Sequence, residues 1–148
     1  MPTVRPARPA DRDPLREIQR EAIAEPWPAL LDTALEGPPP LYVIEDRTPV
    51  GYAIVIPGES VAYIPELAVH PSRHGEGLGS QLLAALCDAF DDRQELRVIV
   101  RAVDTRARSF YEHHGFEPVE RVPDHFEAGD GIVLIRSCVT LYRYRVAR

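Results

Sequence analysis

The chain has 148 residues, of which 45% are hydrophobic, and carries a formal net charge of -6. This length and apolar share suffice for one globular domain with a buried core, so we expect a single domain over residues 1–148. The excess of acidic side chains argues against a nucleic-acid partner, because phosphate backbones are bound through an excess of Lys and Arg.

The sequence does not support a membrane protein, a secreted protein or a metal-binding protein. The apolar runs fall short of the roughly 18 residues that a membrane span needs, and the first residues are too polar for a secretory signal. We therefore expect a cytoplasmic protein. Cys87 and Cys138 fit buried small residues better than a disulfide or metal pair. The scattered histidines predict no metal site.

The N-terminal part of the chain predicts two helices between strands. Asp11 or Asp13 is expected to cap the first helix, which has Pro14 in its first turn, and Gly37 follows the second helix. The expected elements are a strand at 3–6, a helix with Leu15, Ile18 and Ala22 on its apolar face, a helix at 29–36, and a strand pair at 42–45 and 50–57.

The stretch 62–90 is the one around which the chain is organised. A β-prone run over 61–69 stops at His70-Pro71, and a glycine loop leads into a helix that begins at Leu78. The backbone N–H groups of residues 75–80 should therefore converge at a helix N-terminus. Such an end suits a phosphate or pyrophosphate, which glycines allow to approach the main chain.

Two common phosphate-binding loops do not fit this stretch. The loop lacks the Gly-Lys-Ser/Thr ending of a P-loop, and its glycine spacing differs from the dinucleotide pattern G-x-G-x-x-G. Glu95 stands before a strand, whereas a dinucleotide fold places its acidic residue at the end of one.

The C-terminal part predicts an α/β fold with a mixed sheet and helices on its faces. We expect a strand at 96–103, a helix at 106–114, and strands at 116–121 and 132–136. The β-prone composition continues past a typical strand length, over 138–145. This tail either extends the last strand, pairs with a second copy in a homodimer, or folds back as a local hairpin.

Two motifs carry a family resemblance. The loop His74-Gly75-Glu76-Gly77-Leu78-Gly79 resembles the acyl-CoA-binding core Arg/Gln-x-x-Gly-x-Gly/Ala of the GCN5-related N-acetyltransferases, or GNAT superfamily. The segment 104–116 resembles the family's Asn-x-x-Ala and (Leu/Phe)-Tyr-x-x-x-Gly-Phe. Together with the N-terminal opening, the resemblance covers residues 3 to 136. The matching positions of the second motif are Ala107, Phe110, Tyr111, Gly115 and Phe116.

The resemblance implies a GNAT fold, with a central sheet of about seven strands, splayed at the acyl-CoA site, and about four helices. It implies acetyl-CoA as the acyl donor and no metal. Three positions depart from the family pattern, namely His74, Glu76 and Asp104, and Arg73 is a candidate for the missing positive charge. The implied cofactor-binding residues are Leu67, Ala68, Val69, His74, Gly75, Glu76, Gly77, Leu78, Gly79, Ser80, Asp104 and Ala107.

By resemblance, Tyr111 is the general acid that serves the leaving thiolate of CoA. Glu66 is the nearest carboxylate for deprotonating the attacking amine. Strand alternation places Glu66 on the face opposite Tyr63 and Leu67, so a structural or substrate-orienting carboxylate is the alternative. A water relay is a further possibility, because many family members have a basic catalyst where this chain has Tyr63.

The acceptor is expected to be a primary amine, either a small molecule or a peptide N-terminus. Pro26-Trp27 and the segment 121–130 partly match the ribosomal-protein and N-terminal peptide acetyltransferases, but Ile99 stands where that subgroup has its glutamate base. Trp27 either closes the core or forms a wall of the acceptor pocket. An acyl-CoA-binding module without transferase activity is the alternative of another class.

Overall fold

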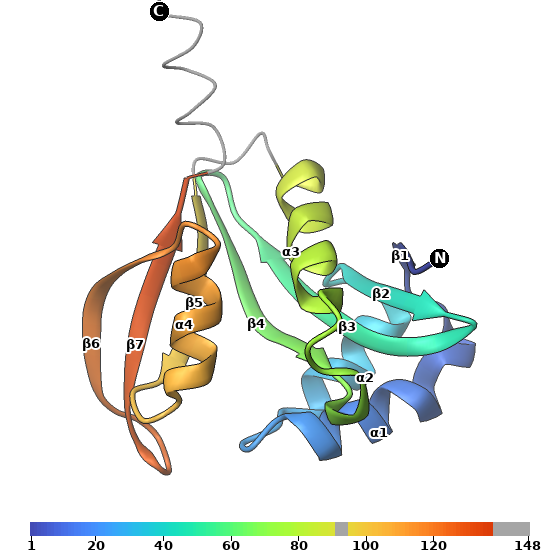
Figure 1. The fold of residues 1–148 in the computed structure, drawn as a ribbon, viewed down its shortest axis with the longest axis horizontal. Coiled ribbons are helices and arrows are strands. Elements are labelled where there is room, and N and C mark those ends of the chain that lie inside the picture. Colours follow the sequence, from blue (N-terminus) through green and yellow to red (C-terminus); the bar gives the residue numbers. More distant parts are fainter. Residues whose placement is uncertain (91–94, 138–148) are drawn as a thin grey trace, which may run out of the picture. The chain divides into compact units, whose positions relative to one another are not determined.

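The computed structural model describes residues 1–90 and 95–137. Its strands form a seven-stranded mixed sheet in the order β1-β2-β3-β4-β5-β7-β6 (Figure 1). Two compact units share this chain: the first comprises residues 1–56 and 64–89, and the second comprises residues 57–63 and the described part of 90–148.

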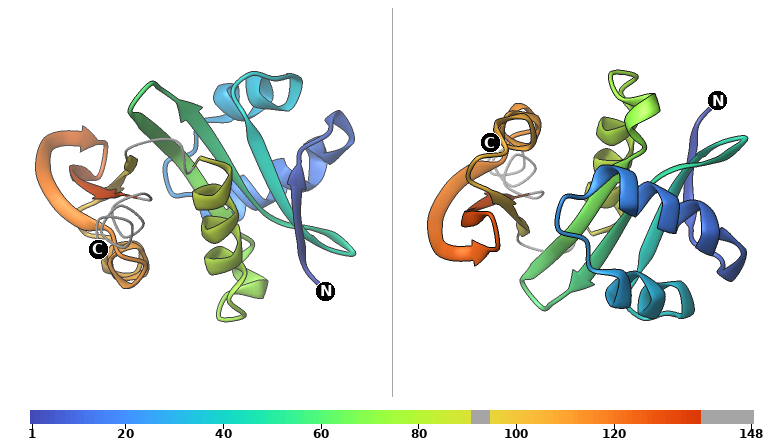
Figure 2. Two further views of the ribbon diagram at one scale, coloured as in Figure 1. Left: turned by 90° about the horizontal axis from the view of Figure 1, so that it is seen from above. Right: turned by 90° about the horizontal axis from the view of Figure 1, so that it is seen from below.

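The first unit holds the N-terminal strands with helices on both of their faces. Helices α1 and α2 cover one face and α3 covers the other (Figure 2). Strands β1, β2 and β3 pair in antiparallel fashion, with Val4 opposite Ile44 and Val43 opposite Tyr52. The elements are β1 (Thr3–Pro6), η1 (Pro9–Asp11), α1 (Arg12–Ala22), α2 (Pro28–Glu36), β2 (Leu41–Asp46), β3 (Thr48–Pro57), β4 (Val61–Val69), η2 (Pro71–Arg73) and α3 (Leu78–Ala89).

The core of the first unit lies between the α1 and α2 helices and the sheet. Its helices contribute leucines and isoleucine at helical spacing, as the sequence predicts for the first helix. The strands contribute alternate residues, which all point to the same face. The core residues are Leu15, Ile18, Leu31, Ala34, Leu35, Leu41, Val43, Tyr52, Ile54 and Ala68.

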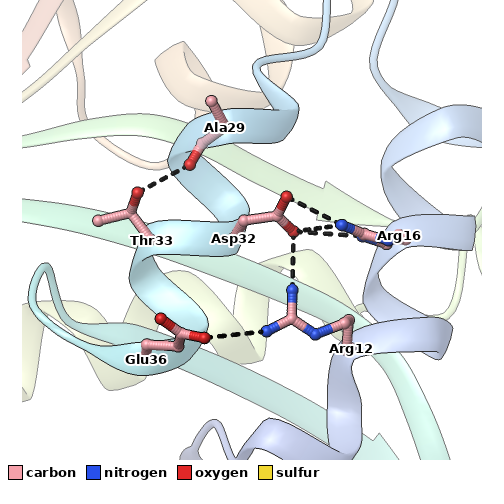
Figure 3. Close-up of polar contacts among 6 residues, drawn as sticks. All are labelled: Arg12, Arg16, Ala29, Asp32, Thr33 and Glu36. Carbon is pink, nitrogen blue, oxygen red and sulfur yellow. Dashed lines mark hydrogen bonds and ion pairs between the residues drawn. The ribbon is translucent and has the colours of Figure 1, made fainter.

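A network of ion pairs joins α1 to α2 on the surface (Figure 3). Asp32 of α2 accepts hydrogen bonds from Arg12, at 3.0 Å, and from Arg16, at 2.8 Å, both on α1. Arg12 also lies 3.6 Å from Glu36. Single exposed pairs contribute little, about 0–1 kcal/mol, but two arginines on one carboxylate hold the helices in register.

The second unit holds the C-terminal strands and one helix. Residues 61–63 of β4 pair in parallel with β5, β5 pairs with β7, and β7 pairs with β6, the last two ladders being antiparallel. Its elements are β5 (Glu95–Arg101), α4 (Thr105–His113), β6 (Glu117–Phe126) and β7 (Gly129–Arg136).

Two sequence-based expectations need correction. The strand predicted at 116–121 continues to Phe126, because Val122 and Phe126 both pair with β7 and the residues between them form a bulge. Pro123 and Asp124 predict a turn, and the bulge accommodates them within the strand, with Asp124 at φ 52°. Asp11 precedes α1, but its carboxylate binds Arg5 and the Arg8 N–H instead of capping the helix.

The tail at 138–148 and Cys138 lie outside the described residues, so the strand extension and the dimer stay predictions. None of the described helices is long and apolar enough to cross a membrane.

Candidate active site

The loop between β4 and α3 contains two glycines whose backbone conformation favours glycine. Gly75 and Gly77 have φ of 82° and 78°, in the left-handed region that favours glycine. A Cβ at either position would meet no atom within 4 Å, so the space before the helix is open. Leu78 is buried and anchors the first turn of α3, whose N–H groups lack intrahelical acceptors.

The side chains of this loop bind one another and the neighbouring strand. Arg73 donates to both oxygens of Glu76, with Nε 2.9 Å from Oε2 and Nη2 3.0 Å from Oε1. Its Nη2 also donates to Asp46 of β2 at 2.7 Å. These hydrogen bonds to the guanidinium lower the pKa of both the Glu76 and the Asp46 carboxyl groups. Glu76 is therefore ionised and held by Arg73.

His74, which stands where the GNAT motif has Arg or Gln, contacts the end of β4. Its Nε2 lies 2.8 Å from the carbonyl oxygen of Val69. The ring is otherwise exposed, so His74 is both a solvent-facing loop residue and a link between the loop and the strand.

The end of β4 packs closely against β3. A Cβ at Gly51 would lie 2.7 Å from the Ala68 carbonyl oxygen and 3.2 Å from the Val69 side chain, so only glycine fits there. Ala68 is buried, whereas Leu67 and Val69 are half-buried on the opposite face of β4. Gly51 thereby sets the position of the strand segment that the GNAT resemblance implies to bind the cofactor.

Glu66 lies on the α1 and α2 face of β4, as strand alternation predicts. It is 6% exposed, and its carboxylate accepts hydrogen bonds from Gln19 Nε2 at 2.9 Å, the Tyr52 hydroxyl at 2.8 Å and the Trp27 N–H at 2.9 Å. Three of about four acceptor positions of the carboxylate are therefore occupied. Burial and the negative charge of Glu66 raise the pKa of Tyr52, which stays a hydrogen-bond donor.

Gln19 and Tyr52 could not be identified as partners of Glu66 from the sequence. They lie 47 and 14 residues away from it and belong to no motif. The Trp27 side chain is 54% exposed. It therefore does not close the core, which was one of its two expected roles.

The second motif lies on α4. Asp104 caps this helix, with Oδ1 accepting from the Ala107 N–H at 3.0 Å. Tyr111 is 7% exposed and packs edge-on against Phe110 and Phe116, with ring centroids 5.1 and 5.2 Å away. The two phenylalanines of the motif thus hold the Tyr111 ring in place.

The environment of Tyr111 keeps its hydroxyl protonated. Burial is the main cause that raises the pKa of the phenol above its ordinary value of 10.0, and the nearby Asp104 and Tyr63 raise it further. Within the described part of the chain the hydroxyl makes no hydrogen bond. A neutral phenol of this kind can donate a proton or a hydrogen bond to an anion.

A hollow of about 660 Å³ opens beside α1 in the first unit. It is lined by residues of α1, the β2–β3 hairpin and η2, and its charges are mixed, with Asp13 and Glu17 alongside Arg20 and Arg73.

Among the described residues no cluster of His, Cys, Asp and Glu could hold a metal ion.

The predicted site residues therefore fall into two groups. The first unit contains Glu66, the end of β4 and the glycine loop. The second unit holds Asp104, Ala107 and Tyr111 on one helix.

Comparison with known proteins decides the family. The protein-family model described as acetyltransferase (GNAT) domain matches residues 39–118, which is more than half of the chain. This chain is a member of the GNAT superfamily. An uncharacterized N-acetyltransferase of Methanocaldococcus jannaschii is 30% identical to this GNAT chain over 131 residues, which cover 84% of each.

Solved GNAT-like structures share the fold. The ribosomal-protein-S18-alanine N-acetyltransferase of Escherichia coli is 23% identical and superposes with a TM-score of 0.82, covering 93% of this chain and 94% of its own. Arabidopsis thaliana NAA60 in complex with acetyl-CoA is 15% identical, with a TM-score of 0.80 and coverages of 93% and 99%. Within residues 1–90 and 95–137, the seven-stranded sheet and the four α-helices match the GNAT fold.

Proposed function

We propose that this GNAT protein transfers an acetyl group from acetyl-CoA to a primary amine, with Tyr111 as the general acid. The observation that carries the proposal is the buried phenol of Tyr111, fixed by an aromatic pair on a helix that Asp104 caps, with a raised pKa. A phenol that is neutral at neutral pH is suited to donate, and not to accept, a proton.

The reaction is a direct attack. The amine lone pair forms a bond to the thioester carbonyl carbon, the carbon–sulfur bond breaks, and the amide product retains the acetyl group. The sulfur leaves as a thiolate that takes a hydrogen bond or a proton from the Tyr111 hydroxyl. The amine loses its own proton to a base or to water.

The donor site consists of the glycine loop and the end of β4. The N–H groups of 75–80 hold the pyrophosphate, since the open space at Gly75 and Gly77 admits a phosphate to the main chain. The backbone of Leu67, Ala68 and Val69 pairs with the pantetheine amides, and Ala107 leaves room for the thiol end. NAA60, which has the same fold, was solved in complex with acetyl-CoA, and this supports acetyl-CoA as the donor.

Glu66 is the candidate base, with the orienting role as its alternative. Its three hydrogen bonds to Gln19, Tyr52 and the Trp27 N–H favour the orienting role, because they leave about one acceptor position for an amine or a water. In that role Glu66 fixes the start of α2, and water carries the amine proton away.

Peptide N-termini are the second candidate acceptors. The exposed Trp27 before α2 and the edge-to-face His125-Phe126 pair before the β6–β7 turn are aromatic surfaces of the kind that peptides contact. The E. coli neighbour acts on an alanine of ribosomal protein S18, according to its name.

A homodimer formed through residues 138–145 remains part of the proposal; a monomeric mass in solution would exclude it.

The test is acetyl-CoA turnover, followed by release of free thiol, against polyamines, amino acids, aminoglycosides and short peptides. Turnover on one class that falls sharply in Tyr111→Phe identifies the acceptor and supports the acid role. Tight binding of acetyl-CoA without turnover on any acceptor favours a non-catalytic acyl-CoA-binding module.

A further inference from the structure

The Arg73 guanidinium is already committed to two carboxylates beside the glycine loop. Its Nε and Nη2 donate to both oxygens of Glu76 at 2.9 to 3.1 Å, and Nη2 also reaches Asp46 at 2.7 Å. In this bidentate geometry, two N–H groups of the guanidinium donate to the two oxygens of one carboxylate. It is the strong form of an Arg–carboxylate pair. Arg73 is the arginine nearest in sequence to the loop, yet the Nε and Nη2 edge of its guanidinium is occupied by Glu76.

We propose that Arg73 is a positioning residue that neutralises Glu76 and holds its carboxylate away from the donor phosphates, and that Asp46 orients Arg73 from the β2–β3 hairpin. The inference rests on the proposed function, because it concerns the acetyl-CoA phosphates. It differs from the expectation that Arg73 supplies a charge directly to the cofactor.

The electrostatic reason lies in the position of Glu76. This residue lies between Gly75 and Gly77, in the loop whose N–H groups we propose to hold the pyrophosphate, so a free carboxylate there would repel a pyrophosphate bound by the loop. Asp46, Arg73 and Glu76 together carry a net charge of -1. The backbone N–H groups then bind the phosphates against a small repulsion, which becomes large if Arg73 is removed.

The test is a double-mutant cycle on acetyl-CoA affinity, measured by titration calorimetry at low and at physiological salt. Arg73→Met should weaken binding about tenfold or more, and Glu76→Gln should strengthen it by about threefold. The double variant should return to within about threefold of the wild type, because the charge that Arg73 neutralises is gone. The differences should shrink as salt rises.

A double variant as weak as Arg73→Met would overturn the inference, since Arg73 would then contact the phosphates directly. Equal affinities for all four proteins would overturn it as well. Arg12→Met is the matched control, because it removes an arginine from a surface pair with Asp32 on α2, and its affinity should stay at the wild-type value. Thermal unfolding of each variant checks that the fold is retained.

Failure of the proposed function gives a different result. A wild-type protein that binds no acetyl-CoA overturns that function, whereas wild-type binding with an unrescued double variant overturns this inference alone.

Discussion

The Tyr52 hydroxyl donates a hydrogen bond of 2.8 Å to the carboxylate of Glu66, and both side chains are buried. The same carboxylate accepts from Gln19 of α1 and from the backbone of Trp27 at the start of α2. The Glu66 carboxylate on β4 is thus hydrogen-bonded to β3, to α1 and to the start of α2. The position of the α1–α2 connection therefore depends on this carboxylate.

Tyr52→Phe should lower the free energy of unfolding by about 1–3 kcal/mol, because it leaves a buried carboxylate with one donor fewer. Urea denaturation at pH 7 measures the change. The control is Tyr63→Phe, whose half-buried hydroxyl makes no hydrogen bond within residues 1–90 and 95–137. A Tyr63→Phe loss as large as that of Tyr52→Phe would contradict the importance of the Glu66 contact.

Tyr111→Phe should reduce kcat by about 10²-fold or more, the usual range for loss of a general acid, while the Kd for acetyl-CoA stays unchanged. Steady-state kinetics and calorimetry separate the two effects. Tyr63→Phe again serves as the control, since it removes a nearby phenol that has no part in the proposed acid step. Equal kcat values for Tyr111→Phe and the wild type would remove the phenol from the mechanism.

The raised pKa of Tyr111 also predicts the alkaline side of the pH profile. A group whose pKa lies above 10.0 remains protonated throughout the neutral and mildly alkaline range. The rate should therefore show no decline due to this residue below about pH 10, and any rise with pH reports deprotonation of the amine or of its base. A kcat that falls with an apparent pKa near 8 would assign the acid to another group.

Gly77→Ala should destabilise the fold by about 1–2 kcal/mol and weaken acetyl-CoA binding, because φ at this position is 78° and an L-residue is strained there. The cost is conformational, since a Cβ would have open space around it. Gly77→Asn is the matched comparison and should lose less stability, because asparagine tolerates this region better. Equal losses in urea denaturation would point to a steric cause instead.

Asp11→Asn should reduce the dependence of stability on acid. The hydrogen bonds from Arg5 hold the pKa of Asp11 below its usual 3.8, so the contribution of this carboxylate is present above about pH 4 and is lost as the pH falls through the folded-state pKa. The variant should be less stable than the wild type at pH 7. Urea midpoints between pH 7 and pH 2.5 should converge toward the acid end, and parallel curves would contradict the effect.

The sequence alone determined the features that depend on local patterns. The change from strand to helical period at Leu78, the glycines at 75 and 77 and the cap at Asp104 are short-range signals, and the structure has the corresponding elements. The two motifs identified the family, because each is a contiguous stretch of sequence that needs no information about distant residues, and the GNAT family model matches residues 39–118.

Only the tertiary structure decided which distant side chains meet. Asp46 lies 27 residues from Arg73, and Gln19 lies 47 residues from Glu66, so no local pattern predicts either contact. The sequence left Glu66 between a base and an orienting role, and its three donors come from three separate elements. The length of β6 was also missed, because its bulge satisfies residues that elsewhere form turns. Chain folding brings such groups together through packing, which local sequence does not encode.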